Sequence, residues 1–234
     1  MSQQNAQNAV FYAVSVGPGD PELLTVKALR AIAACPVIAA PQTRDGRMLA
    51  LEIARGAADL AGKTILPLAF SMSRDPAVRQ AAHREAADRV CAHLAAGQSV
   101  AMLNLGDASV YATASYLAAL VRAAGYPVQV VPGVTSFCAA AARLGEPLVS
   151  DEETLHVLPG GQAAEALAWP GTKVLMKSGR QLPEVLAQLR DAGRLDKAAL
   201  VCNCGLPGEA IYPNLAENAP AEDGGYFATL LLRE

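Results

Sequence analysis

The chain has 234 residues and a formal net charge of −3, and 52% of its residues are hydrophobic while 18% are charged. This composition excludes a disordered protein and supplies enough apolar side chains for one large domain or two small ones. The slight negative charge gives no overall attraction to nucleic acid or to an anionic membrane, so neither is expected as a partner. A polyanionic ligand would need a local basic patch.

The N-terminal stretch is polar and uncharged, so residues 1–9 are predicted to be disordered and not a secretory signal. No stretch approaches the length of uninterrupted apolar sequence that a membrane span requires. Five scattered cysteines favour reduced thiols and a cytoplasmic location. Cys202 and Cys204 lack further ligands at zinc-site spacing, so no metal site is expected.

A ligand-facing turn is the first feature along the chain. An apolar run over residues 10–16 ends at Gly17-Pro18-Gly19, and a helical pattern over 22–34 follows, with Asp20 placed to cap it. The third glycine of a dinucleotide fingerprint is absent because Glu22 stands there. The turn is therefore either a ligand-facing loop of another kind or merely a tight turn.

Strand and helix patterns alternate through the first region. Further strands are predicted at residues 36–40, 64–68, 99–103 and 127–131, and further helices at 48–58, 75–96, 110–121 and 138–144, with Val78, Ala82, Val90 and Leu94 on the apolar side of the long one. Such alternation requires crossover connections and hence a parallel sheet. We expect an α/β domain over 10–145, with a mostly parallel five-stranded sheet and helices on both faces.

A second α/β domain is predicted over residues 146–234, after a hinge at Gly145-Glu146-Pro147. Its strands are predicted at 154–158, 173–177, 199–202, 211–212 and 226–232, and its helices at 163–168 and 183–189. Strands that follow one another without a helix between them indicate a mixed sheet with helices.

Three loops of the first region carry small or polar residues at predicted strand ends: 17–20, 106–109 and 132–136. Ligands of parallel sheets bind at the carboxyl ends of the strands, so these loops predict a pocket. Asp107 could cap a helix, bind a ligand or do both, and Tyr111 could lie in the core or face the pocket. The acidic run Asp151-Glu152-Glu153 is by default a solvated face.

Taken together, these loops resemble the tetrapyrrole methylase family. The motifs that carry the resemblance are residues 16–25, 105–113 and 131–137 and the strand at 174–177. The resemblance covers nearly the whole chain. It implies two α/β domains with S-adenosylmethionine held in the cleft between them, usually in a homodimer, and a porphyrin-like substrate of cobalamin or sirohaem synthesis.

Within the family, the sequence is similar to the subgroup that methylates C20 of precorrin-2 or cobalt-factor II in cobalamin biosynthesis. The resemblance rests on Leu105-Gly106-Asp107, the run over 136–148 and the pair Asp151-Glu152. Two alternatives stay open. One is a methyltransferase of this fold acting on uroporphyrinogen III, another precorrin, a diphthamide precursor or ribosomal RNA. The other is a non-catalytic tetrapyrrole or nucleotide carrier.

The resemblance also implies site residues. The predicted cofactor contacts are Pro18, Leu105, Gly106, Asp107, Val110, Thr135, Ser136 and Met176, with Gly205 and Leu206 contributing backbone. A base that takes the C20 proton is sought among Asp107, Tyr111 and Asp151. The substrate carries eight carboxylates, and the predicted substrate contacts are Gly17, Gly19, Asp20, Arg44, Arg47, Lys177 and Arg180.

Two segments depart from the family pattern. Ala108 stands where proline is usual, which is expected to loosen that loop. The segment from Asn203 to Pro207 stands in the place of a common Glu-Arg-Ala-Thr, so the arginine of that motif is missing from the contacts expected of the second domain.

Overall fold

The computed structural model describes residues 9–220 and 227–234. The chain divides into two compact units, with the boundary between Thr135 and Ser136. The predicted disorder at the N-terminus falls on residues 1–8, outside the described part, apart from Ala9. Ala9 is only 2% exposed and belongs to the core of the first unit, so the disorder prediction is wrong at this residue.

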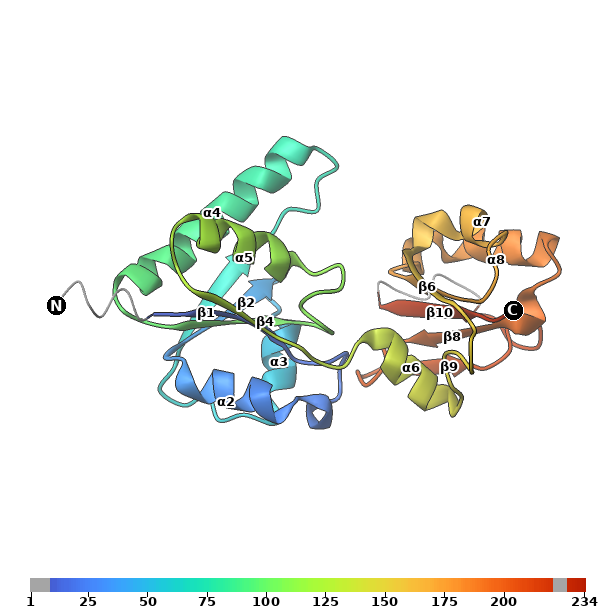
Figure 1. Cartoon of the computed structure of the whole chain (residues 1–234), viewed down its shortest axis with the longest axis horizontal. Coiled ribbons are helices and arrows are strands. Elements are labelled where there is room, and N and C mark those ends of the chain that lie inside the picture. Colours follow the sequence, from blue (N-terminus) through green and yellow to red (C-terminus); the bar gives the residue numbers. More distant parts are fainter. Residues whose placement is uncertain (1–8, 221–226) are drawn as a thin grey trace. The chain divides into compact units, whose positions relative to one another are not determined.

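The first unit is built on a five-stranded sheet. Its strands are β1 (Phe11–Ser15), β2 (Val37–Gln42), β3 (Thr64–Ala69), β4 (Val100–Asn104) and β5 (Val128–Val131), in the order β3-β2-β4-β1-β5 (Figure 1). All neighbouring pairs are parallel, which confirms the predicted parallel sheet. All five strands therefore end at one edge, which we call the carboxyl edge.

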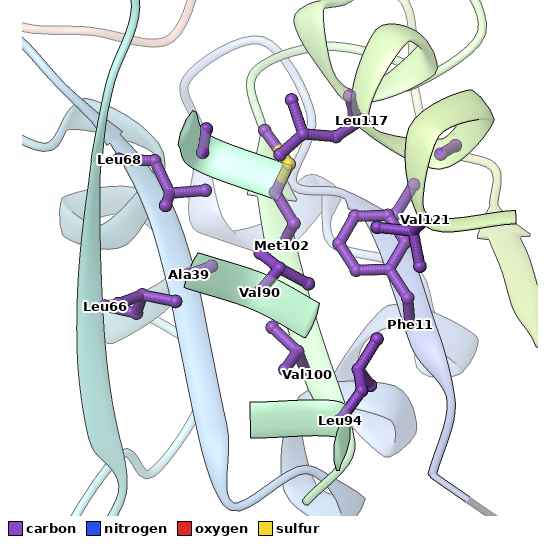
Figure 2. Close-up of a cluster of buried hydrophobic side chains, with 14 of the residues drawn as sticks. Phe11, Ala39, Leu66, Leu68, Val90, Leu94, Val100, Met102, Leu117 and Val121 are labelled. Atoms are coloured by element: carbon purple, nitrogen blue, oxygen red, sulfur yellow. The ribbon is translucent and has the colours of Figure 1, made fainter. Parts of the chain in front are cut away.

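Helices cover both faces of this sheet (Figure 1). One face carries α4 (Pro76–Ala95) and α5 (Thr113–Ala123), and the other carries α2 (Val26–Ala34) and α3 (Leu49–Arg55). Phe11 and Met102 on the sheet lie against the α4 and α5 side chains Val90, Leu94, Leu117 and Val121 (Figure 2). Because alternate residues of each buried strand point to opposite faces, both helix layers find an apolar surface.

Three helix predictions need correction. The helix predicted over 22–34 is two elements, because Asp20 caps a 3₁₀ turn, η1 (Pro21–Leu23), and Thr25 then caps α2 by accepting a bond from Ala28 N at 3.1 Å. α5 begins at Thr113 and not at residue 110, since Tyr111 has a φ of 46° that no right-handed helix allows. Val78 was predicted on the apolar side of α4 but is 47% exposed, because the buried residues of α4 begin at Ala86.

The second unit contains a mixed sheet. Its strands are β6 (Leu155–Pro159), β7 (Thr172–Met176), β8 (Ala198–Cys202), β9 (Ala210–Tyr212) and β10 (Ala228–Leu232), in the order β6-β7-β10-β8-β9. β6 and β7 are parallel and the other neighbours are antiparallel, which confirms the predicted mixed sheet. Tyr226, predicted to begin the last strand, lies outside the described residues.

Helices also cover this second sheet. They are α6 (Ser136–Leu144), α7 (Ala163–Ala166) and α8 (Leu182–Asp191), with short 3₁₀ turns η2 (Gly160–Gln162), η3 (Gly179–Gln181) and η4 (Leu195–Lys197). Buried α8 side chains pack with Leu200 and Leu230 of the sheet. α6 packs on β8 and β10, which is why the unit boundary precedes α6, whereas the predicted hinge at residues 145–147 follows it.

Among the described residues, no helix combines the length and the apolar character needed to cross a bilayer.

Candidate active site

Two loops at the carboxyl edge are joined by a backbone bridge. Gly17 N donates to Gly106 O at 3.3 Å, and Gly106 N donates to Gly17 O at 2.7 Å. Both residues have left-handed φ angles, +76° and +71°, which favour glycine. Both the N–H and the carbonyl of Gly106 take part in this bridge, so its predicted cofactor contact would use the second lone pair of the carbonyl oxygen.

Asp107 joins two loops through its side chain. Its Oδ1 accepts bonds from Ser109 N at 2.8 Å and from the Ser109 hydroxyl at 2.5 Å, and its Oδ2 accepts from Gly133 N at 2.8 Å. The residue is only 7% exposed. Burial raises the pKa of the carboxyl, but the hydrogen bonds from Ser109 and Gly133 outweigh it and leave the pKa below its ordinary value. Asp107 is therefore an ionised carboxylate of low basicity.

Ser15, which was not among the predicted site residues, links the same loops through two hydrogen bonds. It is fully buried at the end of β1, where its Oγ donates to Val131 O at 2.7 Å and accepts from Ala108 N at 2.8 Å. The available signal was a serine at the end of a strand whose other residues are apolar or aromatic. Together, Ser15, Asp107 and Gly133 form what we call the loop network, which joins the ends of β1, β4 and β5.

The backbone N–H of Ala108 takes part in the loop network. The alanine was expected to loosen its loop, but its N–H is the donor to Ser15, and the residue is only 2% exposed. A proline there would have no N–H to donate. The loop is therefore held by a buried hydrogen bond that a proline could not make.

Gly133 is tightly enclosed by the loop network. A Cβ added at Gly133 would lie 2.4 Å from Ser15 Cβ. Such a separation is far below a van der Waals contact, so only glycine fits between the two loops without a backbone shift.

Backbone strain collects at predicted site residues. Among the described non-glycine residues, positive φ angles occur at Tyr111 (46°), Asp151 (48°), Lys177 (58°) and Asn203 (51°). The first three are predicted catalytic or substrate residues. Left-handed backbone costs on the order of 1 kcal/mol for a residue with a side chain, and it is concentrated at functional sites in known proteins. This supports the predicted role of these positions.

The other predicted residues of the first unit lie on the same loops. Gly17, Pro18 and Gly19 are buried, whereas Leu105 and Val110 are half-buried and Tyr111 is 47% exposed. Asp20 is engaged locally, because its Oδ1 accepts from Glu22 N at 2.9 Å. Asp20 is therefore a cap of η1, whatever it contributes to a ligand.

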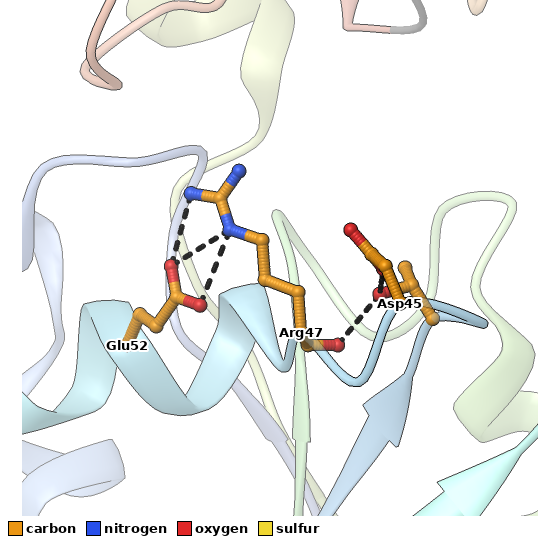
Figure 3. A network of polar contacts seen from close by, with 4 residues as sticks. Asp45, Arg47 and Glu52 are labelled. Carbon is orange, nitrogen blue, oxygen red and sulfur yellow. Dashed lines mark hydrogen bonds and ion pairs between the residues drawn. The ribbon is translucent and has the colours of Figure 1, made fainter.

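The predicted arginines follow β2 and differ in their partners. Arg47 forms an ion pair with Glu52, whose carboxylate lies 3.0 Å from Nη2, and this pair raises the pKa of the guanidinium (Figure 3). Asp45, beside it, accepts a bond from the Thr43 hydroxyl, which holds the pKa of that carboxyl below its ordinary value. Arg44 is exposed, and no hydrogen bond or ion pair of its side chain occurs among residues 9–220 and 227–234. Arg44 is thus the better candidate for a substrate carboxylate.

In the second unit, the predicted residues follow β7 and β8. Met176 ends β7 and is 9% exposed, Lys177 follows it, and Ser178 is fully buried against Gly160. Desolvation lowers the pKa of the Lys177 ammonium. Arg180 lies in η3, but its side chain is outside the described part of the structure. Asp151 is exposed in the turn before β6.

Residues 203–209, which include the segment expected to depart from the family pattern, form a loop with hydrogen bonds between its own residues. Gly205 N donates to Glu209 Oε2 at 2.6 Å, and Leu206 N donates to Asn203 O at 2.8 Å. Arg143 of α6 lies 3.2 Å from the same Glu209 oxygen. The N–H groups of Gly205 and Leu206 are therefore used internally, and their predicted backbone contacts are directed to carbonyl oxygens.

Thr135 and Ser136 mark the end of the β5 loop and the start of α6. Ser136 Oγ accepts from Thr229 Oγ1 at 3.3 Å, a bond within the second unit. The positive end of the helix dipole favours negative charge near such a helix start. Within the described ranges, no group of three or more His, Cys, Asp or Glu side chains is arranged to hold a metal ion.

The family model described as Tetrapyrrole (Corrin/Porphyrin) Methylases matches residues 10–220. The chain belongs to this family. It is 35% identical to the cobalt-precorrin-2 C(20)-methyltransferase of Salmonella typhimurium, with 97% of each chain covered. It is 36% identical to the precorrin-2 C(20)-methyltransferase of a Sinorhizobium species, covering 94% of this chain and 93% of that one.

Solved structures agree with this assignment at the level of the fold. The uroporphyrin-III C-methyltransferase of Thermus thermophilus, solved in complex with S-adenyl homocysteine, aligns with a TM-score of 0.67 at 24% identity, over 97% of this chain and 98% of that one. The predicted tetrapyrrole methylase-like fold and family resemblance are thereby confirmed.

Proposed function

We propose that this protein transfers the methyl group of S-adenosylmethionine to C20 of precorrin-2 or its cobalt-containing counterpart in cobalamin biosynthesis. The observation that carries the proposal is the nearly full-length identity of 35–36% to two C20-methyltransferases. Membership of the tetrapyrrole methylase family and the pre-formed loops of the carboxyl edge support it.

The residues present suit the proposed cofactor. In the first unit, the half-buried Val110 offers apolar surface to an adenine. In the second unit, Met176 offers a thioether that is 9% exposed, and Ser136 begins α6. The carbonyl oxygens of Leu105 and Gly106 are acceptors for a ribose or an ammonium group. S-Adenosylmethionine, when bound, supplies an electrophilic methyl on a sulfonium, which C20 of the electron-rich macrocycle takes as the carbon–sulfur bond breaks, leaving S-adenosylhomocysteine.

The main work of the protein in such a reaction is positioning. No side-chain nucleophile is needed, because the macrocycle itself supplies the electron pair. The loop network fixes the ends of β1, β4 and β5 before any ligand arrives, so little ordering is left to be done on binding. The network also gives Asp107 a structural role that its catalytic assignment did not include.

Tyr111 and Asp151 are the two remaining candidates for the base that accepts the C20 proton. Asp107 is a poor choice, because three hydrogen bonds already stabilise its charged form. Tyr111 lies on the same loop, is 47% exposed and is held in a left-handed conformation. Asp151 shares that backbone feature, in the second unit. General-base catalysis contributes about 10²- to 10⁴-fold, so the true base is recognisable from the loss of kcat.

The proposal is tested by anaerobic incubation of the protein with S-adenosylmethionine and, separately, precorrin-2, cobalt-factor II and uroporphyrinogen III. Mass spectrometry would detect one added methyl group, and carbon NMR would place it at C20. The faster of the first two substrates shows whether cobalt belongs in the substrate. Methylation of uroporphyrinogen III alone would retain the family and contradict the proposed acceptor.

The same proposal includes a homodimer and a cytoplasmic location. The homodimer is tested by light scattering of the purified protein, and the location by fractionation of the source cells.

A further inference from the structure

Three aromatic rings form a ladder from the core of the first unit to its surface. Phe70, which follows β3, packs against the core, and its ring centroid lies 5.9 Å from that of His83 on α4. The His83 ring stacks on Tyr116 of α5, with centroids 4.8 Å apart and planes inclined by only 11°. Tyr116 is nevertheless 61% exposed. The Tyr116 ring is therefore held in place by the His83 ring and is still exposed to solvent.

Further large apolar side chains are exposed on the segments that adjoin the ladder in the chain. Met72 is 76% exposed in the segment between β3 and α4, and Val78 is 47% exposed in the first turns of α4. Tyr111, 47% exposed, lies on the loop that leads into α5. Large apolar side chains that gather on a surface mark sites that bind something, because exposing them to water is unfavourable. We call Met72, Val78, Tyr111 and Tyr116 the apolar patch.

The apolar patch lies at the carboxyl edge. The 70–75 segment leaves the carboxyl end of β3, and the loop that leads into α5 leaves the carboxyl end of β4. Tyr111 shares that second loop with Asp107 and Gly106 of the proposed cofactor site. A ligand on the apolar patch would therefore be on the same edge as the residues that are proposed to bind the methyl donor.

Cationic groups flank the ladder. Arg79 binds the 70–75 segment, since its Nη1 donates to Ser73 O at 2.7 Å and to Arg74 O at 2.8 Å. Burial and the nearby Arg79 lower the pKa of His83, which favours the neutral form of its ring. The exposed Arg74 side chain makes no hydrogen bond or ion pair with any residue that the structure describes. The segment that Arg79 links to the ladder thus adds an exposed positive charge to the exposed ring of Tyr116.

We propose that the apolar patch is the surface on which the tetrapyrrole macrocycle stacks, with the face of the ring system on Tyr116 and a peripheral carboxylate on Arg74. This inference rests on the proposed function and specifies where its substrate binds. A second copy of the chain could also cover an apolar patch, but the exposed Arg74 favours a ligand that combines a flat apolar body with negative charges at its edge. A tetrapyrrole octacarboxylate is such a ligand.

The experiment compares Tyr116→Ala with Tyr116→Phe, which keeps the ring and removes only the hydroxyl. Uroporphyrin III is the binding probe, because it is a stable flat octacarboxylate whose absorbance reports binding. We expect Tyr116→Ala to weaken its binding about 3- to 10-fold, the range of an aromatic stacking contact, and Tyr116→Phe to bind as wild type does. The KM for the methyl acceptor should rise by a similar factor in Tyr116→Ala, with kcat retained.

Arg74→Glu supplies a second, independent variant. Its control is Arg122→Glu in the last turn of α5, which makes the same charge change near the opposite end of that helix. We expect Arg74→Glu to weaken uroporphyrin binding and Arg122→Glu to leave it unchanged. S-Adenosylhomocysteine binding, measured by calorimetry, should stay the same in all four variants.

The outcomes separate this inference from the proposed function. Methyl transfer by the wild type together with unchanged macrocycle binding in Tyr116→Ala and Arg74→Glu would overturn the inference alone. If the variants change the mass of the assembly measured by light scattering and leave macrocycle binding unchanged, the inference is overturned in favour of a second copy. A wild-type protein that binds S-adenosylhomocysteine but no tetrapyrrole would overturn both.

Discussion

At the carboxyl edge of the first sheet, buried side chains join loops that follow different strands, whereas the Asn203–Glu209 loop of the second unit is closed on itself. Ser15 and Asp107 bond groups that are distant in the sequence and are 0% and 7% exposed. Glu209 bonds Gly205 within its own loop and Arg143 of α6, and the two charged side chains are 25% and 45% exposed.

The difference lies in what happens when a partner is removed. A buried donor that loses its acceptor has no water to replace it, so the unfolded state gains in relative stability. A partly exposed donor can bond to water, and an exposed ion pair contributes little. The first set of loops is therefore rigid and intolerant of change, while the second can vary. The segment over 203–207, which is expected to depart from the family pattern, belongs to this second, more exposed kind of loop.

The largest effect that this comparison predicts is that of Gly133→Ala. The new Cβ would lie 2.4 Å from Ser15 Cβ, so the β5 loop must move and its bond from Gly133 N to Asp107 must stretch. We expect a loss of about 1–3 kcal/mol in the free energy of unfolding, measured by urea denaturation. Adding Ser15→Gly removes the atom in collision, and the double variant should be more stable than the sum of the single effects. Additive losses would show that the two loops are not in contact.

Asp107→Asn is expected to have the next largest effect. The amide has one acceptor oxygen and places a donor near N–H groups that need acceptors, which costs about 1–3 kcal/mol near neutral pH. Asp75→Asn is the control, because asparagine caps a helix as well as aspartate does, and Asp75 caps α4 in an exposed position.

The loss in the free energy of unfolding caused by Asp107→Asn should also depend on pH. The pKa of Asp107 is lower in the folded protein than its ordinary value of 3.8. The stability that the carboxylate contributes is therefore fully present above that ordinary value and is lost as the pH falls through the folded pKa. The difference between wild type and Asp107→Asn should shrink from about pH 5 towards about pH 2. A difference that is constant over this range would show that Asp107 is not held as a charged hydrogen-bond acceptor.

The strands were predictable from the sequence because each buried strand is a nearly continuous apolar run between turn residues. The parallel direction of the strands in the first sheet was predictable from the helices between them. Helix starts were less predictable where two capping residues compete, as at Asp20 and Thr25, or where a loop residue such as Tyr111 adopts a left-handed conformation.

Contacts between distant residues were not predictable from local patterns. The bond from Ala108 N to Ser15 Oγ spans 93 positions of the chain, and nothing local to either residue announces it. Likewise, the motif that contains Asp107 indicates a site but not that its carboxylate holds the β5 loop. Arg47 resembled Arg44 as a free cation until the structure placed it against Glu52.

The smallest expected effect is that of Glu209→Gln in the second unit. Glutamine keeps an oxygen that can accept from Gly205 N, so the variant loses mainly the ion pair with Arg143. We expect a loss of at most about 1 kcal/mol in the free energy of unfolding, below that of Asp107→Asn, because both charged groups remain hydrated. Arg143→Gln should cost a similar amount, and the double variant little more, since both remove one pair. If Glu209→Gln lowers the free energy of unfolding as much as Asp107→Asn does, the Asn203–Glu209 loop is held as rigidly as the loops of the first unit. The expected departure from the family pattern would then reflect a different fixed structure and not a tolerance of change.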